Sequence, residues 1–406
     1  MKKSVKDLGD VRGKRALVRV DVNVPLDAEK NVTDDTRIQA IIPTVRYLQE
    51  KGAKIILMAH LGRPKGEWNP EFSLEPVARH MSKVLGEDVL FVSKPIGDGA
   101  AEELENLENG KVALLENIRY YKAEEAKDDD MTFAEELAKL GDFYVNDAFG
   151  AAHRNHTSTA KVAKLLNPAV SGLLMEKEIR CLSQALDNPT RPFTAVVGGA
   201  KVSSKIGVLE NLIDKVDNLI IGGGMAYTFV KANGGKIGNS ICEDDQLEVA
   251  KAIEKKAADK GVKLIMATDV LVTNDFSGNG ENKVVDVKNI PDGFEGVDAG
   301  PETQKAFEEV VKTSKTILMN GPVGAFETPA FAEGTKAILK AIVEATKNGA
   351  TSVIGGGDSV SAAKKFCNAE DFTHVSTGGG ASLEFIEGKI LPGVAALDDV
   401  EEVAKV

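Results

Sequence analysis

Basic side chains and glycine-rich loops divide this sequence into two halves. In the first half, arginines and histidines follow short apolar runs, at Arg19, Arg37, His60, Arg63, Arg119, His153, Arg154 and His156. In the second half, glycines take the equivalent positions, at 198–201, 222–224, 355–359 and 378–380. Cationic side chains suit a small, highly charged ligand, whereas backbone amides at strand-to-helix turns suit the phosphate tail of a nucleotide. The pattern predicts two phosphorylated ligands, one for each half, as a transferase requires.

Length and charge set the bounds on this prediction. A chain of 406 residues is too long for one core at ~150 residues per domain, and we expect two domains. Its 50 basic and 62 acidic residues give a net charge of −12, which disfavours nucleic acid and anionic membrane as partners. An anionic substrate therefore needs a local basic patch.

The apolar runs and the cysteines of the sequence predict where in the cell the protein is located. No run approaches the ~18 apolar residues of a membrane span, and the N-terminus lacks an apolar signal core. Cys181, Cys242 and Cys367 are far apart and form no C-x-x-C pattern. We expect reduced thiols and a cytoplasmic protein.

Strands alternate with helices along the chain. Apolar runs typical of buried parallel strands occur at 16–20, 54–58, 112–115, 143–145, 193–197, 218–221, 263–266, 316–319 and 351–354. Helical patterns lie between them, such as the one that begins after Asp34 and Asp35 and stops at Gly52. These βαβ units predict an α/β protein with two doubly wound parallel-sheet domains, joined by a helix, with a ligand cleft between them. Ligands bind at the carboxyl ends of parallel strands, where the basic and glycine clusters fall.

The apolar spacing also predicts the domain boundaries. Residues 1–170 form a first domain, 171–186 a connecting helix and hinge, and 187–390 a second domain. The tail 391–406 is expected to pack back on the first domain, because it carries an apolar stripe at Leu391, Val394, Leu397, Val400 and Val403.

Each motif taken alone also has a plain structural interpretation. The segments 19–25 and 60–64 could be a proline-set turn and a solvated loop. His153 and His156 lack a third residue that would make a metal site, so anion binding is the simpler interpretation of that cluster. The joint occurrence of so many basic residues at one sheet edge favours a functional role.

The glycine loops also have both a structural and a functional interpretation. None matches the P-loop consensus, and 222–224 lacks the spacing of a dinucleotide fingerprint, so a glycine triple can be only a tight turn. The attached side chains favour a nucleotide. Lys201 and Lys205 lie about one helical turn apart and can reach one phosphate chain. Asp358 offers a carboxylate for a nucleotide-bound Mg²⁺, Ser359 a hydroxyl for a phosphate oxygen, and Glu327 a carboxylate for ribose hydroxyls.

Six segments together closely resemble the phosphoglycerate kinase family. They are 19–25, 60–64, 146–154, 198–202, 320–327 and 374–384. The match runs in order from about Lys14 to Gly393. The departures are Ser204, where the family usually has an acidic residue, and Met319, where tryptophan is common, and they concern packing near the nucleotide.

The resemblance implies a role for each matching residue. The phosphoglycerate would be bound by Asp21, Asn23, Arg37, His60, Leu61, Gly62, Arg63, Arg119 and Arg154. ATP or ADP would be bound by Lys201, Lys205, Asn320, Glu327, Gly356, Gly357, Asp358 and Ser359, with Asp358 as the Mg²⁺ ligand. The catalytic set would be Arg37 and Lys201, assisted by the amides near Gly357 and Gly380.

The resemblance further implies a glycolytic kinase that acts as a monomer. The reaction would be reversible transfer of a phosphoryl group between 1,3-bisphosphoglycerate and ADP, giving 3-phosphoglycerate and ATP. In the reverse direction the nucleophile is a carboxylate, which with a pKa near ~4 is already deprotonated, so no general base is required. Closure of a hinge would bring the two ligands into line.

Two other classes remain open on the residues alone. A nicotinamide-dependent oxidoreductase shares this architecture, but its glycine fingerprint followed by an acidic residue is not found. A nucleotide sensor needs only the glycine-rich half and leaves the basic residues unexplained.

Overall fold

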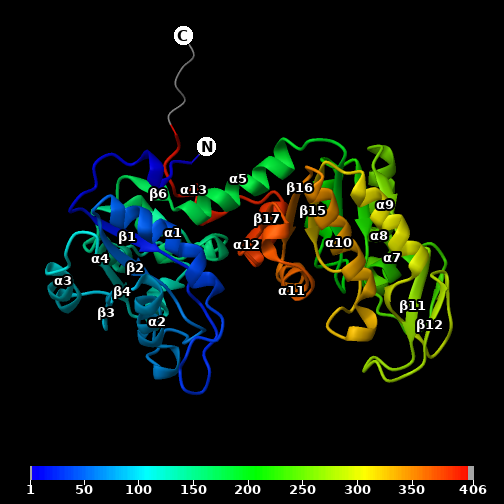
Figure 1. The fold of residues 1–406 in the computed structure, drawn as a ribbon, viewed down its shortest axis with the longest axis horizontal. Coiled ribbons are helices and arrows are strands. Elements are labelled where there is room, and N and C mark those ends of the chain that lie inside the picture. Colours follow the sequence, from blue (N-terminus) through cyan, green and yellow to red (C-terminus); the bar gives the residue numbers. More distant parts are fainter. Residues whose placement is uncertain (1, 401–406) are drawn as a thin grey trace, which may run out of the picture. The chain divides into compact units, whose positions relative to one another are not determined.

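The computed structural model describes residues 2–400 of the chain. These residues form two compact units, the first comprising the residues up to Ile179 together with those from Ile390 onward, and the second Arg180–Lys389. Each unit is built on a six-stranded parallel sheet (Figure 1). The predicted α/β class with two doubly wound parallel sheets is confirmed. No helix in the described residues is long and apolar enough to cross a membrane.

The first sheet has the strand order β3-β4-β2-β1-β5-β6. Its strands are β1 (Arg15–Arg19), β2 (Lys54–Met58), β3 (Val89–Val92), β4 (Val112–Leu115), β5 (Phe143–Asn146) and β6 (Ala169–Ser171). The central strands are almost wholly buried because helices cover both faces of the sheet. Ala16 and Val18 pack under α1 (Thr36–Glu50) and α2 (Glu75–Leu85). On the opposite face, Leu17 packs with α3 (Asp98–Glu105) and α4 (Thr132–Ala138).

Helix α1 follows the prediction closely. The carboxylate of Asp34 accepts hydrogen bonds from the backbone N–H and the hydroxyl of Thr36, which fixes the first turn. Beyond Glu50, Gly52 adopts a φ of 72°, a left-handed conformation that ends the helix. The helix therefore starts and stops where the local sequence signals place its ends.

The second sheet has the order β10-β8-β7-β15-β16-β17 and is also parallel. Its strands are β7 (Phe193–Val197), β8 (Asn218–Ile221), β10 (Lys263–Ile265), β15 (Thr316–Asn320), β16 (Thr351–Gly355) and β17 (His374–Val375). The helices of this unit are α6 (Ile206–Ile213), α7 (Ala226–Ala232), α8 (Leu247–Asp259), α9 (Pro301–Lys312), α10 (Glu333–Lys347), α11 (Gly357–Phe366) and α12 (Gly380–Ile386). Residues of α9, α10 and α11 form one core with β7, β8, β15 and β16.

A small β-rich insertion in the second unit was not predicted. β11 (Asp269–Thr273) pairs antiparallel with β12 (Asn282–Asp286) and β14 (Glu295–Ala299), and the short strands β9 (Lys236–Ile237) and β13 (Asn289–Ile290) pair with each other. Val270 and Val272 of β11 pack with Tyr227 of α7 in a separate core. β12 is half exposed and carries charged residues, so it lacks the continuous apolar run of a buried strand.

The predicted start of the connecting helix requires a correction. Helix α5 spans Leu173–Asp187, whereas the predicted start near residue 170 or 171 lies in strand β6. Val170 and Ser171 pair with Val145 and Asn146 of β5. Tertiary pairing at the sheet edge thus replaces what reads as the first turn of a helix.

The C-terminal segment as far as Val400 lies in the first unit. The amide of Gly393, in α13 (Pro392–Ala395), donates to the carbonyl of Ala152, and the amide of Asp398 donates to the carbonyl of Ala169. Lys3 near the N-terminus donates in turn to the carbonyl of Asp398, and Lys2 forms an antiparallel bridge with Asp399. Val403, the last residue of the predicted apolar stripe, lies outside the described residues.

Candidate functional site

The basic residues of the first unit lie at the carboxyl ends of adjacent parallel strands. Arg19 is the last residue of β1, His60 follows β2, Arg119 follows β4, and Arg154 follows β5. These strands are neighbours in the sheet order β4-β2-β1-β5. The parallel topology therefore brings side chains from four distant segments to one edge of the sheet.

Arg37 reaches this edge from the first turn of α1. Its Nη1 donates to Oδ1 and Oδ2 of Asp21 at 3.0 and 3.2 Å and to the carbonyl of Asn23 at 3.2 Å. Asp21 also accepts from the amide of Asn23, and the side-chain oxygen of Asn23 accepts from the amide of Gly62 at 2.9 Å. The residues predicted from three separate segments are thus joined by hydrogen bonds, and Arg37 remains 41% exposed.

His60 and Arg119 are buried beneath this layer. The Nη1 of Arg119 donates to the carbonyl of Gly62 at 3.1 Å, and its Nε lies 3.4 Å from Glu125. The carbonyl of Leu61, the residue before Gly62, accepts from the side chain of Asn117. The loop that follows β2 is therefore fixed by contacts on both sides, which is more ordered than a solvated loop. Arg63 and Arg154 are exposed.

Burial and positive charge lower the pKa values of two histidines near this edge, His60 and His156. The pKa of His60 lies well below its ordinary value, first because the ring is buried and then because Arg19, Arg119, Arg37 and His156 surround it. The pKa of His156 falls to about 3, from burial and from Arg119, Arg19 and Arg154. Both rings are neutral near pH 7, so the arginines supply the positive charge for an anionic ligand.

The sequence missed the buried residues that support this edge. It places Arg19 there without assigning it a role, and it gives no signal for Glu124 or Ser158. Arg19 is fully buried, its Nε donates to Ser158 at 2.8 Å, and Ser158 donates to Glu124, which is also fully buried. Glu124 stands in a run of charged residues that reads as a solvated surface, so only tertiary structure identifies it.

In the second unit, the two predicted lysines differ in environment. Lys201 follows β7 and is exposed, whereas Lys205 at the start of α6 is half-buried and its Nζ donates to the side-chain oxygen of Asn320. Burial lowers the pKa of Lys205, and the nearby Asp358 and Glu387 oppose that shift. Asn320, at the end of β15, is wholly buried and donates to the carbonyl of Gly355 at 3.2 Å. Asn320 therefore connects Lys205 to the loop after β16.

The glycine segments 198–201 and 222–224 pack against each other and against the loop that contains Gly321 and Pro322. A Cβ on Gly198 would lie 2.0 Å from the carbonyl oxygen of Pro322, and one on Gly321 would lie 2.1 Å from that of Gly198. A Cβ on Gly223 would lie 2.7 Å from the backbone of Gly199. These glycines are required for close approach of loops, so the plain structural interpretation accounts for 222–224.

The loop after β16 is different because it leads to an accessible helix N-terminus. Gly356 has a φ of 86° and precedes α11, whose first residues Gly357 and Asp358 are exposed. A Cβ on Gly357 would have no neighbour within 4 Å. Ser359 is buried and its hydroxyl accepts from the amide of Gly321. The N-terminus of this helix offers backbone N–H groups to an anion.

Glu327 and Gly380, the remaining predicted residues of this unit, are exposed. The backbone carbonyl of Glu327 accepts a hydrogen bond from Lys365, so this contact does not involve the side-chain carboxylate of Glu327. Gly380 is the first residue of α12. Asp358 is not part of a cluster, since the described residues contain no group of three His, Cys, Asp or Glu side chains that could hold a metal ion.

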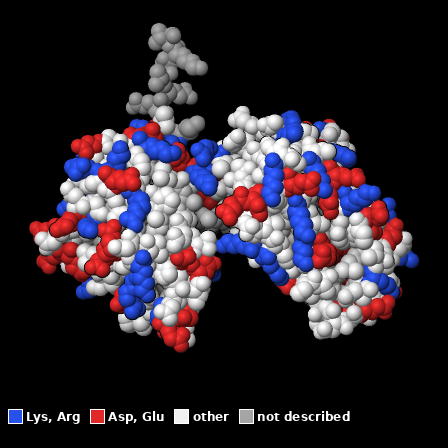
Figure 2. Space-filling view, viewed as in Figure 1, with Lys and Arg blue, Asp and Glu red and all other residues white. Residues whose placement is uncertain are grey.

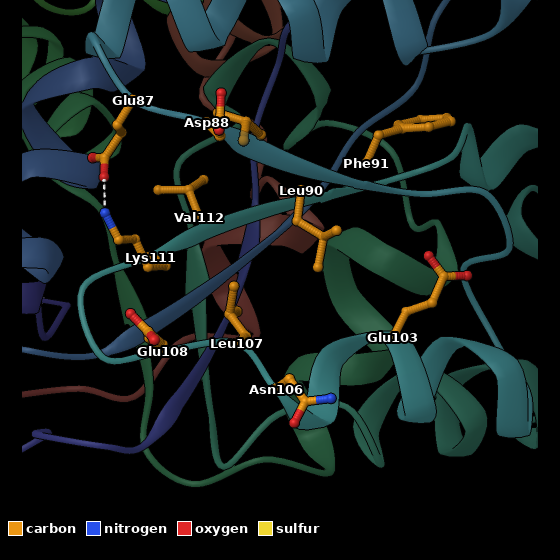
Figure 3. Close-up of a pocket in the computed structure, with 11 residues that line it drawn as sticks. Glu87, Asp88, Leu90, Phe91, Glu103, Asn106, Leu107, Glu108, Lys111 and Val112 are labelled. Atoms are coloured by element: carbon orange, nitrogen blue, oxygen red, sulfur yellow. Dashed lines mark hydrogen bonds and ion pairs between the residues drawn. The ribbon is translucent and has the colours of Figure 1, made fainter.

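A large open cavity lies elsewhere in the first unit. It has a volume of about 820 Å³ and is lined by the start of β3, the start of β4 and the end of α3 (Figure 3). Leu90, Leu107 and Val112 form its apolar lining, and Glu87 pairs with Lys111 at 2.8 Å. Figure 2 shows acidic side chains over α3, where Asp98, Glu102, Glu103 and Glu105 are exposed. The cavity includes the amino ends of β3 and β4, away from the predicted site, and its surroundings are unsuited to an anion.

Comparison with known proteins decides the family. The sequence model for phosphoglycerate kinase matches residues 5–389. The chain belongs to the phosphoglycerate kinase family. It is 52% identical over 400 residues to the phosphoglycerate kinase of Nostoc sp., covering 98% of this chain and 99% of that one. It is 53% identical over 390 residues to that of Synechococcus elongatus, covering 96% of each.

Solved structures agree with this assignment. The phosphoglycerate kinase of Coxiella burnetii has a TM-score of 0.89 and 40% identity, covering 98% of both chains. That of Pyrococcus horikoshii has a TM-score of 0.81 and 32% identity, covering 97% of this chain and 98% of that one. The chain is therefore a phosphoglycerate kinase enzyme that reversibly transfers a phosphoryl group between 1,3-bisphosphoglycerate and ADP in glycolysis. The oxidoreductase and sensor alternatives are excluded.

Proposed function

We propose that the basic edge of the first unit binds the phosphoglycerate and that the loops of the second unit bind ADP or ATP. The observation that carries the proposal is the gathering of Arg37 and Arg119 around a neutral His60, with Arg154 beside the neutral His156, at the carboxyl edge of the sheet. A phosphoglycerate carries several negative charges on few atoms, and arginine matches both phosphate and carboxylate geometry. Asp21 and Asn23 orient Arg37 and the loop after β2 in this arrangement.

The nucleotide phosphates would lie between the lysines and the N-terminus of α11. Lys205 is directed by Asn320, while Lys201 is exposed and can follow the transferred group. The amides at Gly356 and Gly357 and the hydroxyl of Ser359 are at the helix end that favours anions. Glu327 would accept hydrogen bonds from the ribose.

A single protein carboxylate is enough to bind the Mg²⁺ that accompanies a nucleotide. Mg²⁺ in nucleotide sites takes one or two carboxylates and completes its shell with phosphate oxygens and water. Asp358 is exposed on the first turn of α11 and would provide that one ligand. Bound there with ADP or ATP, Mg²⁺ would neutralise phosphate charge.

The chemistry then consists of positioning and charge neutralisation. In the direction of ATP use, a carboxylate oxygen of 3-phosphoglycerate forms a bond to the γ-phosphorus while the bond from that phosphorus to the β-phosphate oxygen breaks. The carboxylate is already ionised, so no side chain must remove a proton. Arg37 and Lys201 would stabilise the loose, anionic phosphoryl group, assisted by the amides near Gly357 and Gly380.

A coupled assay tests the assignment of the two ligands. ATP alone is compared with ATP plus 3-phosphoglycerate, and ADP release is followed with wild type, Arg119→Ala and a control, Arg46→Ala. We expect release only with both substrates, and a higher KM for 3-phosphoglycerate in Arg119→Ala. Arg46 is an exposed arginine of α1 that contacts Glu87 away from the site, so its replacement should change neither KM. An unchanged KM for 3-phosphoglycerate in Arg119→Ala would contradict the assignment.

The monomeric state and the cytoplasmic location stay predictions. The three cysteines are free thiols, which agrees with a reducing compartment. Sedimentation of the purified enzyme and fractionation of the source cells would check the two expectations.

A further inference from the structure

The hydrogen bond between Arg19 and His60 defines the protonation of the imidazole ring. The Nη2 of Arg19 lies 2.9 Å from Nδ1 of His60. A guanidinium group only donates hydrogen bonds, so Nδ1 must accept with its lone pair. In a neutral imidazole the single N–H is then at Nε2. Within the described residues of the first unit, no hydrogen-bond partner is found for that Nε2.

Arg19 cannot turn away from this contact. Its side chain is fully buried, its Nε donates to Oγ of Ser158 at 2.8 Å, and its Nη1 donates to the carbonyl of Val20. With Nη2 on His60, the guanidinium plane is fixed by acceptors on three of its nitrogens. Rotation of the arginine would leave buried donors unsatisfied, which is unfavourable by the full desolvation of each group.

Ser158 and Glu124 hold the guanidinium of Arg19 in the orientation from which it donates to His60. The hydroxyl of Ser158 donates to Oε1 of Glu124 at 2.6 Å, and its amide donates to Oε2 at 2.9 Å. A hydroxyl has one proton, so Ser158 must accept from Arg19. Glu124 is fully buried and both of its oxygens are used by Ser158. The order therefore runs from guanidinium to hydroxyl to carboxylate. Burial raises the pKa of Glu124, while Arg19 and the hydrogen bonds from Ser158 oppose that shift.

The surroundings of His60 disfavour a second proton on the ring. Arg19, Arg37, Arg119 and His156 face it, and none carries negative charge. Burial adds to this effect and keeps the pKa of His60 well below its ordinary value. A neutral ring with its proton on Nε2 is a directional donor between cationic neighbours.

We propose that Glu124 and Ser158 are positioning residues which, through Arg19, hold His60 as the neutral Nε2–H tautomer that donates to the phosphoglycerate. The part concerning the ligand rests on the proposed function of the basic edge. The part concerning the tautomer rests on the protein alone. A carboxylate and a hydroxyl that do not belong to the substrate-binding set thereby control the donor that the substrate meets.

The tautomer can be observed directly without substrate. In enzyme labelled with ¹⁵N in the histidine rings, long-range proton–nitrogen correlation spectra near about pH 7 assign the proton of His60, with His60→Gln identifying its signals. We expect a protonated Nε2 and an unprotonated Nδ1 in wild type. In Ser158→Ala and Glu124→Gln the signals should shift toward a mixture of tautomers, because the guanidinium of Arg19 is no longer held against Nδ1.

Thr157→Val is the matched control. Thr157 neighbours Ser158, is equally buried, and its hydroxyl donates to the carbonyl of Ala123 at 2.8 Å, so it joins the same two segments without contacting Arg19. A purely structural role of the network predicts the same spectra for Thr157→Val as for Ser158→Ala. The proposal predicts that Thr157→Val keeps the wild-type tautomer.

Kinetics test the consequence for the substrate. Ser158→Ala should raise the KM for 3-phosphoglycerate at least about tenfold, as for loss of a hydrogen bond to a charged group, and leave the KM for ATP unchanged. In a His60→Ala background the same substitution should add nothing, because both changes remove one interaction. If His60→Ala leaves the KM for 3-phosphoglycerate unchanged, the proposed role of His60 in substrate binding fails while the spectra still decide the tautomer.

Three results would overturn the positioning role. They are a proton on Nδ1 of His60 in wild type, an unchanged tautomer in both Ser158→Ala and Glu124→Gln, or the same spectral change in Thr157→Val. If the two variants do not fold, Arg19→Lys replaces them, since lysine keeps the charge but cannot join Ser158 and His60 with one planar group. An unchanged tautomer in Arg19→Lys would also overturn the proposal.

Discussion

The contacts of Arg37 predict whether this residue contributes to substrate binding or to the rate of phosphoryl transfer. One nitrogen of its guanidinium is held by Asp21 and the carbonyl of Asn23, and 41% of the side chain is exposed. The contact with Asp21 fixes the direction of the group, so ordering it on substrate binding requires little further entropy. A preorganised cation of this kind is most effective where negative charge increases during the reaction.

Replacement of Arg37 is therefore predicted to act on turnover. Arg37→Ala should lower kcat by raising the activation free energy by ~2.7 kcal/mol or more, about the effect of removing one oxyanion donor. Steady-state kinetics with saturating ATP and 3-phosphoglycerate measure it, with Arg46→Ala as the control from the same helix. A variant with normal kcat and only a higher KM would assign Arg37 to ground-state binding alone.

The two lysines of the second unit are predicted to differ in the same way. Lys201→Ala should lower kcat by raising the activation free energy by a similar ~2.7 kcal/mol or more, because Lys201 is proposed to contact the phosphoryl group during transfer. Lys205→Ala should mainly weaken nucleotide affinity, since Lys205 is held by Asn320 beside the loop after β16. Calorimetric titration with ADP and turnover measurements separate the effects. If Lys201→Ala keeps full turnover and only raises the half-saturating nucleotide concentration, the assignment is reversed.

At the scale of elements, the start of α5 depends on one buried carboxylate. Oδ1 of Asp147, just after β5, accepts from the amides of Leu174 and Met175 in the first turn of α5. Gly172 must be a glycine, because a Cβ there would lie 2.1 Å from this oxygen. The carboxylate satisfies amides that the helix leaves unpaired and favours its positive end. Burial nevertheless raises the pKa of Asp147 to about 6, partly opposed by these hydrogen bonds.

This shift predicts a pH dependence of stability. Between the ordinary pKa of an aspartate and about 6, the unfolded chain has released the proton that folded Asp147 retains. Its contribution to stability is complete at lower pH and is lost as pH rises through about 6, with a slope of up to ~1.4 kcal/mol per pH unit. Asp147→Asn cannot ionise and should lack this loss, as urea unfolding followed by circular dichroism across this range would show.

Asp142→Asn is the control with the opposite sign. The hydrogen bond from Arg15 holds the pKa of Asp142 below its ordinary value despite some burial, so this carboxylate adds stability as pH rises. Its replacement should remove a gain rather than a loss. Equal pH profiles for wild type and Asp147→Asn would show that Asp147 is not protonated in the folded state.

At the scale of the whole molecule, the two proposed sets of ligand-binding residues are divided between two compact units. Each ligand is proposed to contact only one of them, yet transfer requires reacting atoms roughly 3 to 3.5 Å apart in a site that excludes water. α5 belongs to both units, because the division falls between Ile179 and Arg180 inside it. We therefore propose that the units close on substrate binding, with α5, the loop before Phe193 and the segment after Gly380 as the hinge.

Small-angle scattering tests this closure. The radius of gyration should be smaller with both 3-phosphoglycerate and the ATP complex bound than with neither, and each ligand alone should give partial closure. A non-hydrolysable ATP analogue prevents turnover during the measurement. An unchanged radius in the ternary complex would rule out hinge closure.

The sequence by itself predicted nine of the twelve strands of the two sheets and the residues at their carboxyl ends, whereas β3, β6 and β17 were not predicted. Buried parallel strands are continuous apolar runs, and α1 has local signals at both ends, so neighbouring residues suffice to predict them. β12 and the start of α5 escaped prediction because their structure depends on pairing with distant strands rather than on local pattern.

Only the tertiary structure decided which residues support the site. Glu124 lies in a charged run that reads as surface, and its burial beneath Arg19 depends on Ser158, which is distant in the chain. The close packing of Gly198 against Gly321 likewise joins loops from different strands. Local sequence contains the secondary-structure propensities and the hydrophobic periodicity of each element. The partner of a buried charge, in contrast, comes from a distant part of the chain and is set by the tertiary fold.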